Sequence, residues 1–211
     1  MKTLALAALF VSIALADPTL FYSKSFPGSV PAYAEVTLTP AGDGSYREDP
    51  ADEQPQKFRL LPSEATAIFD LAGKLDHFSQ PLESGLKVAK TGDKTFRWID
   101  GAKKSEQKFN YTTNPEAQAL LIWFERITDT ERSYFDLERT AKFDRLGVNQ
   151  SLLLIQSLIE KKRLVAGEQF LPLLDRVGKN VSYINMARDR ANEIAAVIRR
   201  SQATPAEPAS K

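Results

Sequence analysis

The chain has 211 residues, enough for one large domain or two small ones. It contains no cysteine and one histidine, which excludes disulfides and thiol chemistry and leaves a zinc site with mostly carboxylate ligands, a set that zinc rarely uses. Lysine and arginine together number 28 and aspartate and glutamate 27, so the chain has no general attraction for nucleic acid or for an anionic membrane.

Residues 1–16 have the pattern of a secretory signal peptide. Lys2 is the only charge, and an apolar run from Leu4 to Leu15 ends in the small-x-small sequence Ala14-Leu15-Ala16. This run is shorter than the roughly 20 apolar residues that cross a bilayer. We therefore expect cleavage after Ala16, a mature bacterial-type chain without a membrane span, and a location in the periplasm or outside the cell.

Residues 17–113 predict an antiparallel sheet with one packed helix and a hairpin. Apolar and polar residues alternate along 32–39, which is typical of a half-buried strand. A helical stripe of apolar residues follows Pro62. Further along, two alternating stretches within 94–111 predict a hairpin around Asp100-Gly101.

Residues 114–200 predict a helical region of about four helices. Asn114-Pro115 is a capping residue followed by a proline at the first helical position, and the apolar face of the helix that starts there is expected to continue to Leu146. Thr128 to Glu131 also fits a capping box, which would allow a break in that helix. The expected fold class is α+β, because strands come first and helices follow.

The end of the chain predicts a helix and a tail. Small and apolar residues recur at helical spacing along 181–200, so that another helix could approach this face closely. Residues 201–211 contain mainly proline, alanine, serine and polar residues and are expected to be disordered.

The search for chemical motifs gives mainly exclusions. His77 is the only histidine that a Ser-His-Asp triad could use, and no Gly-x-Ser-x-Gly sequence accompanies it. The acids between 43 and 53 lack the spacing of a calcium-binding loop, and there is no glycine-rich phosphate loop. The motifs therefore predict no catalytic residue, metal site or cofactor. Enzyme activity stays open, because two carboxylates in a cleft suffice for glycoside hydrolysis.

The predicted hairpin carries the side chains most suggestive of binding. Phe96 and Trp98 share one face of its first strand, Phe109 and Tyr111 share one face of the second, and basic residues lie between them. Aromatic rings flanked by cations can bind sugars, so Trp98, Tyr111 and His77 are the candidate ligand-binding residues. A buried aromatic face with a solvated basic back gives the same alternation, and we favour that interpretation.

The opening of the expected α+β part resembles a known family. Residues 25–33 read SFPGSVPAY, an alternating strand and the turn Gly42-Asp43-Gly44 follow, and the predicted helix ends near Asp76-His77-Phe78. This order resembles a family of uncharacterised exported bacterial domains, whose opening typically has two cysteines that this chain lacks. Over about residues 22–127, the resemblance implies a small α+β fold and an envelope location, and no activity.

Three hypotheses of function follow. The leading one is a non-enzymatic binding protein of the cell envelope, whose C-terminal helices bind a partner protein or a second copy of the chain. The first alternative is a hydrolase that uses two carboxylates about 5 to 10 Å apart in a cleft. The second is a glycan-binding module that uses Trp98 and Tyr111.

Overall fold

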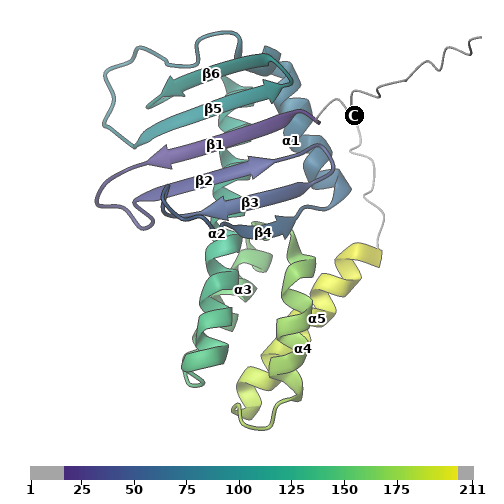
Figure 1. The fold of residues 1–211 in the computed structure, drawn as a ribbon. Helices are drawn as coiled ribbons and strands as arrows, with labels where there is room; N and C mark the ends of the chain where they lie inside the picture. The colour runs from purple at the N-terminus through teal and green to yellow at the C-terminus, as the bar shows by residue number, and fades with distance from the viewer. Residues whose placement is uncertain (1–16, 204–211) are drawn as a thin grey trace, which may run out of the picture.

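The computed structural model describes residues 17–203 and has strands first and helices second, which confirms the α+β class (Figure 1). The expected signal peptide and residues 204–211 of the expected tail lie outside the described residues. The strands are β1 (Thr19–Ser25), β2 (Tyr33–Leu38), β3 (Asp43–Arg47), β4 (Gln56–Arg59), β5 (Asp93–Asp100) and β6 (Lys103–Phe109), and the helices are α1 (Pro62–Lys74), α2 (Pro115–Phe143), α3 (Val148–Glu160), α4 (Leu171–Lys179) and α5 (Asn185–Ala203).

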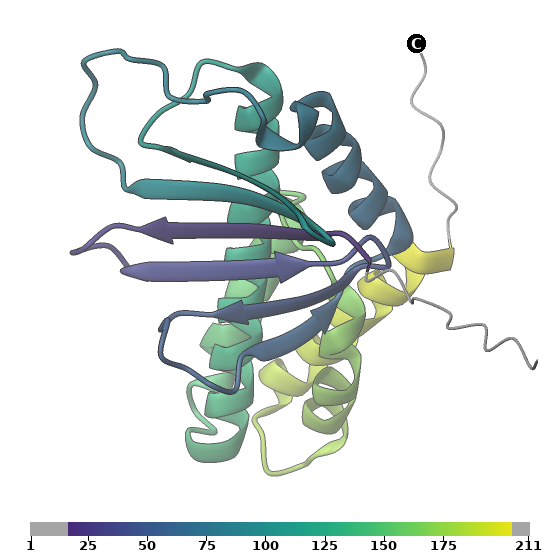
Figure 2. The same cartoon turned by 45° about the horizontal axis from the view of Figure 1, so that its top comes forward.

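The six strands form one antiparallel sheet in the order β4-β3-β2-β1-β5-β6. Helix α1 connects the edge strand β4 to β5. Strand β5 pairs with the side of β1 that does not face β2. In this register Tyr22 lies opposite both Val36 and Phe96, so the apolar residues of three neighbouring strands share one face. Helices α1 and α2 lie on that face, and the opposite face is open (Figures 1 and 2).

The hairpin predicted around Asp100-Gly101 is confirmed. Strands β5 and β6 pair from Lys94 opposite Phe109 to Asp100 opposite Lys103. Gly101 has a φ of 56°, in the left-handed region where a glycine avoids the steric penalty of a side chain.

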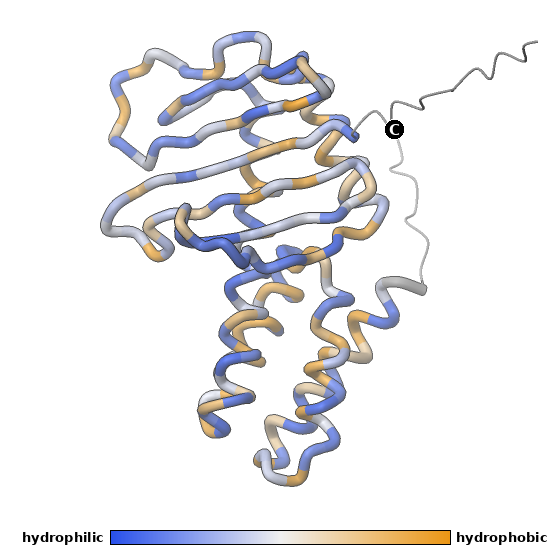
Figure 3. The backbone as a smooth tube through the Cα atoms, in the orientation of Figure 1, coloured by the Kyte–Doolittle hydropathy of each residue, from blue (hydrophilic) through white to orange (hydrophobic). Residues whose placement is uncertain are grey.

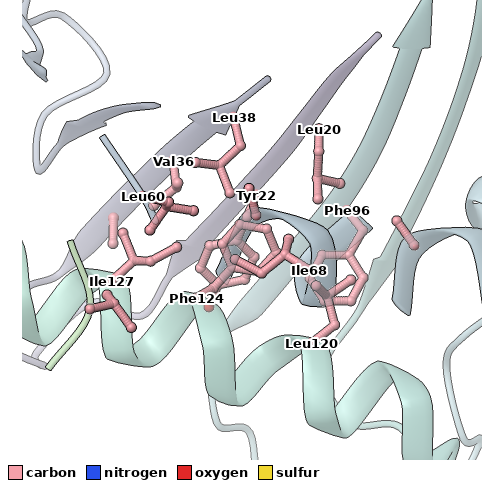
Figure 4. Close-up of a cluster of buried hydrophobic side chains, with 14 of the residues drawn as sticks. Leu20, Tyr22, Val36, Leu38, Leu60, Ile68, Phe96, Leu120, Phe124 and Ile127 are labelled. Atoms are coloured by element: carbon pink, nitrogen blue, oxygen red, sulfur yellow. The ribbon is translucent and has the colours of Figure 1, made fainter. Parts of the chain in front are cut away.

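The core beneath the sheet is aromatic and aliphatic (Figure 4). The rings of Tyr22 and Phe124 are stacked, with centroids 4.5 Å apart. Phe96 and Phe109 are almost completely buried, so the core interpretation is confirmed for these two residues of the hairpin. The labelled members of the core in Figure 4 are Leu20, Tyr22, Val36, Leu38, Leu60, Ile68, Phe96, Leu120, Phe124 and Ile127.

Helix α2 connects the sheet to the helical lobe formed by its own second half and by α3, α4 and α5. The Asn114 side chain caps it by accepting a hydrogen bond of 3.0 Å from the backbone N–H of Ala117, as the sequence predicts. The helix has 29 residues and is therefore about 44 Å long. Its first half packs on the sheet, whereas Leu137 in its second half belongs to the core of the helical lobe.

For α2, the alternative of a break does not occur, and one expectation is wrong. The segment from Thr128 to Glu131 contains no break, and α2 is regular on both sides of it. The apolar face also stops short of Leu146: the helix ends at Phe143, and Leu146 lies in the following turn with 82% of its surface exposed.

The small-residue face of α5 lies inside the helical lobe. Ala187, Ala191 and Ala195 are buried, together with Ile194 and Ile198. Helix α5 therefore uses this face to pack within its own chain, and a partner would have to bind elsewhere. The helix continues to Ala203, three residues into the expected tail. Among residues 17–203, no helix has both the length and the apolar character needed to span a membrane.

Candidate functional site

A groove runs along the second half of α2. It consists of two adjoining hollows that share Phe135 and Glu138, and we call the whole surface the α2 groove. The first hollow, of about 470 Å³, lies between α2 and the segment 46–56 that contains the β3–β4 loop. The second, of about 510 Å³, is lined by α2 and by Arg176 of α4. The groove thus extends from the edge of the sheet along the helical lobe.

One exposed face of α2 supplies most of the groove. Its residues recur three and four positions apart and so lie on one side of the helix, opposite the side that packs into the lobe. At the two ends of this face stand Phe135 and Phe143, which are 56% and 74% exposed. The face consists of Phe135, Glu138, Arg139, Lys142 and Phe143.

The two hollows carry opposite charge. The first has four carboxylates and one guanidinium, and we call it the acidic half; it contains Glu48, Asp49, Asp52 and Glu138 together with Arg47. The second has three cations and shares the one carboxylate, and we call it the basic half; it contains Arg139, Lys142 and Arg176 together with Glu138. The groove therefore changes sign along its length, with phenylalanine on either side of the change.

Local hydrogen bonds shape the loop of the acidic half. Asp49 accepts a bond of 2.9 Å from the backbone N–H of Ala51, and Asp52 accepts one of 2.8 Å from that of Gln54. Both bonds are Asx turns, which fix the loop while leaving the carboxylates exposed. Glu48 is held by the hydroxyl of Tyr46 at 2.7 Å and by the guanidinium of Arg132 at 3.0 Å.

A buried carboxylate joins the walls of the groove from behind. Glu131 of α2 is fully buried and accepts hydrogen bonds from the side-chain amides of Gln56 on β4, at 2.6 Å, and of Gln169, at 2.7 Å, in the turn before α4. Burial raises the pKa of Glu131 to about 7, although the two amide bonds oppose the shift. The residue thus connects the sheet, α2 and the helical lobe, which is a role that its sequence neighbours do not reveal.

The structure brings two of the three candidate ligand-binding residues together. The rings of His77 and Trp98 have centroids 4.3 Å apart, and the ring of Phe69 on α1 lies 5.7 Å from that of Trp98. His77 is exposed on a left-handed turn, with a φ of 49°, whereas Trp98 is partly buried against the sheet core.

Tyr111 lies apart from that pair. Trp98 pairs with Ser105 in the hairpin, and Tyr111 follows six residues later, which corresponds to roughly 20 Å along a strand. The buried rings of Phe96 and Phe109 lie between the two positions. The hairpin therefore does not present a single continuous aromatic platform.

Side chains for a metal site are not gathered in the described part of the chain. Within residues 17–203 there is no group of three or more His, Cys, Asp or Glu side chains arranged to hold a metal ion. The carboxylates of the acidic half line a hollow without converging on one point.

The chain matches no protein-family model, no curated protein and no solved structure. The functional argument therefore rests on the α2 groove and on the surfaces around it.

Proposed function

We propose that the chain is a non-enzymatic binding protein that acts outside the cytoplasm, with the α2 groove as its binding surface. The observation that carries this proposal is one exposed helix face with a phenylalanine at each end and a reversal of charge between them. Large apolar side chains grouped in a groove and rimmed by charge are typical of protein interaction sites. The export part of the proposal rests on the signal-like residues 1–16.

A second copy of the chain is the partner that fits this surface best. In a twofold symmetric contact each copy uses the same patch, so the patch must complement itself. If two α2 helices pair antiparallel, Phe135 of one copy lies beside Phe143 of the other, and each acidic half faces a basic half. A partner of uniform charge would be repelled at one of the two halves.

Sedimentation velocity of the chain from residue 17 onward tests this function. We expect a monomer–dimer equilibrium that shifts toward dimer with concentration and toward monomer with added salt, because the opposed charges are exposed and screened. Phe135→Ser should weaken the dimer, whereas Ile122→Ser, at an exposed α2 position outside the groove, should leave it unchanged. A chain that stays monomeric at its highest soluble concentration and at low salt contradicts the proposal.

A hydrolase is the second candidate, because the acidic half gathers four carboxylates in one hollow. A general acid at neutral pH needs a raised pKa, and in this region the carboxyl with that property is Glu131. Glu131 is fully buried and both of its oxygens accept amide hydrogen bonds, so a substrate in the hollow cannot reach it. Release of reducing sugar from a panel of polysaccharides, abolished by Glu138→Gln, would favour the hydrolase over the binding protein.

The glycan-binding alternative is reduced to His77 and Trp98, since Tyr111 lies at the other end of the hairpin. A sugar that stacks on this pair should change the fluorescence of Trp98, and Trp98→Phe should remove the change. If soluble oligosaccharides leave the emission of the wild-type chain unaltered, this alternative fails.

A further inference from the structure

The far end of the helical lobe presents a second apolar surface, separate from the α2 groove. Here the turn between α2 and α3 and the turn between α4 and α5 lie at the same end of the lobe (Figure 1), and Figure 3 shows hydrophobic segments in both. The most exposed of these side chains are Leu146 and Val181, at 82% and 81%. We call this surface, residues 144–149 and 179–190, the distal tip; its exposed apolar residues are Leu146, Val181, Ile184 and Met186.

Contacts between the helix ends that flank the two turns hold the distal tip together. The side-chain amide of Asn149 donates to the sulfur of Met186 at 3.8 Å, and Arg190 donates to the side-chain oxygen of Asn149. Tyr183 donates its hydroxyl proton to the carbonyl of Ala141 at 2.8 Å. The apolar side chains therefore project from segments at one end of the lobe whose flanking helices are bonded to one another.

The exposed residues of the tip are not needed to complete the core of the lobe. The same two segments already supply Val148, Tyr183 and Ala187 to that core, and all three are buried. A second set of large apolar side chains points away from it into solvent. A scattered exposed apolar residue needs no explanation, whereas several at one end of a molecule indicate a surface that is covered in use.

The tip is also basic, although the chain as a whole is nearly neutral. Its two segments hold four cations, Arg145, Lys179, Arg188 and Arg190, and two acids, Asp144 and Asp189. Of the acids, Asp144 is engaged in its own turn, where it accepts a hydrogen bond of 3.0 Å from the backbone N–H of Gly147. No ion pair within residues 17–203 engages Arg145 or Lys179.

We propose that the distal tip docks onto an anionic lipid bilayer. Leu146 and Val181 enter the boundary between headgroups and acyl chains, and Arg145 and Lys179 contact lipid phosphates. Apolar side chains at the apex with cations around them are the combination by which proteins bind an anionic membrane surface without crossing it. A bilayer is deformable and needs no matching pocket at the tip, and this contact uses none of the residues that line the α2 groove, which ends at Phe143 next to the tip.

Co-sedimentation with lipid vesicles tests the tip. The chain from residue 17 onward should bind vesicles of phosphatidylcholine that contain phosphatidylglycerol, and should bind pure phosphatidylcholine vesicles much less. Added salt should weaken the binding. Leu146→Ser with Val181→Ser should reduce the vesicle partition coefficient about tenfold or more, because both insertions are lost. Arg145→Gln with Lys179→Gln should reduce binding to the anionic vesicles alone.

A matched control lies on the sheet lobe. Leu86 and Val88 are also exposed, at 57% and 43%, in the loop before β5, so Leu86→Ser with Val88→Ser should bind vesicles as the wild type does. Circular dichroism and thermal unfolding should be unchanged in all three double variants, because the altered side chains are exposed or make no ion pair. Absent binding of the wild type to anionic vesicles, or an equal loss in the control, overturns the proposal. Wild-type binding together with dimers that need Leu146 would instead assign the tip to a protein contact and also overturn it.

Discussion

The sheet lobe and the helical lobe both have a face that is left uncovered by the other elements within residues 17–203, and the two faces differ in chemistry. On the open face of the sheet, Glu35 is only 8% exposed, because Arg47 pairs with it and the hydroxyl of Tyr33 donates to it at 2.6 Å. Phe21 on the same face lies under the guanidinium of Arg97, 4.3 Å from the ring centroid. On this face the sheet thus pairs the Glu35 carboxylate internally and covers the ring of Phe21 with a guanidinium.

The helical lobe leaves several large apolar side chains exposed, although the ammonium of Lys142 lies 4.9 Å from the ring centroid of Phe143. Phe135 and Phe143 in the α2 groove and Leu146 and Val181 at the distal tip are all more than half exposed. The contrast fits the proposed function: the ion pair and the cation–π contact on the sheet face serve stability, whereas we propose that the exposed apolar side chains of the helical lobe serve binding. Each of the following predictions tests that division of roles.

The largest expected effect is the difference in unfolding free energy between two phenylalanine substitutions on the same helix. Phe124 is fully buried against the sheet, so Phe124→Ala should lower the free energy of unfolding by about 3 to 5 kcal/mol through the cavity it leaves. Phe135 is 56% exposed, so Phe135→Ala should change the free energy of unfolding by no more than about 0.5 kcal/mol and should weaken the dimer. Urea unfolding and sedimentation velocity of both variants measure the two effects. Equal destabilisation by the two substitutions would show that the groove is structural.

The next effect concerns the joint between the lobes. Because burial raises the pKa of Glu131 from 4.5 to about 7, its neutral form is favoured in the folded state. The stabilisation that this group gives is complete below its unfolded pKa and is lost as the pH rises through 7, at a cost of about 3 kcal/mol. Glu131→Gln keeps the shape and removes the charge, and its new NH2 is satisfied when the amide of Gln56 or Gln169 turns its oxygen toward it. The variant should therefore gain stability over the wild type at pH 8 and little at pH 4.

Urea unfolding at several pH values between 4 and 8 measures this difference. Glu138→Gln removes an exposed carboxylate two turns away on the same helix and serves as the matched control, with an expected pH dependence close to that of the wild type. If Glu131→Gln and the wild type change in parallel with pH, the buried carboxylate does not titrate as its burial implies.

Local patterns in the sequence predicted much of the fold, because they depend on neighbouring residues. The alternation within 94–111 and the cap at Asn114 each produced the expected element. The spacing of small residues along 181–200 predicted a close neighbouring helix but could not identify it, because the neighbour depends on tertiary structure: α4 and α3 of the same chain pack against this helix. The role of Glu131 depends on Gln56, which is 75 residues away in the chain.

The α2 groove shows the same limit. Phe135, Glu138 and Phe143 stand at helical spacing in the sequence, but apolar residues occupy other sides of α2 as well. Which side faces solvent is decided by α3, which packs along α2, and by the core of the lobe, in which Leu137 is buried. The reversal of charge appears only when the β3–β4 loop and Arg176 are placed beside the helix.

A charge exchange between two variants tests the self-complementary groove most directly. Asp49→Lys with Asp52→Lys makes both halves of the groove basic, and Arg139→Glu with Lys142→Glu makes both halves acidic. Each variant alone should be monomeric in sedimentation velocity at low salt, because like charges then face each other at both ends. An equimolar mixture of the two should restore a dimer that contains one copy of each. Dimers of either variant alone, or a mixture that stays monomeric while the wild type dimerises, would contradict the antiparallel pairing of α2.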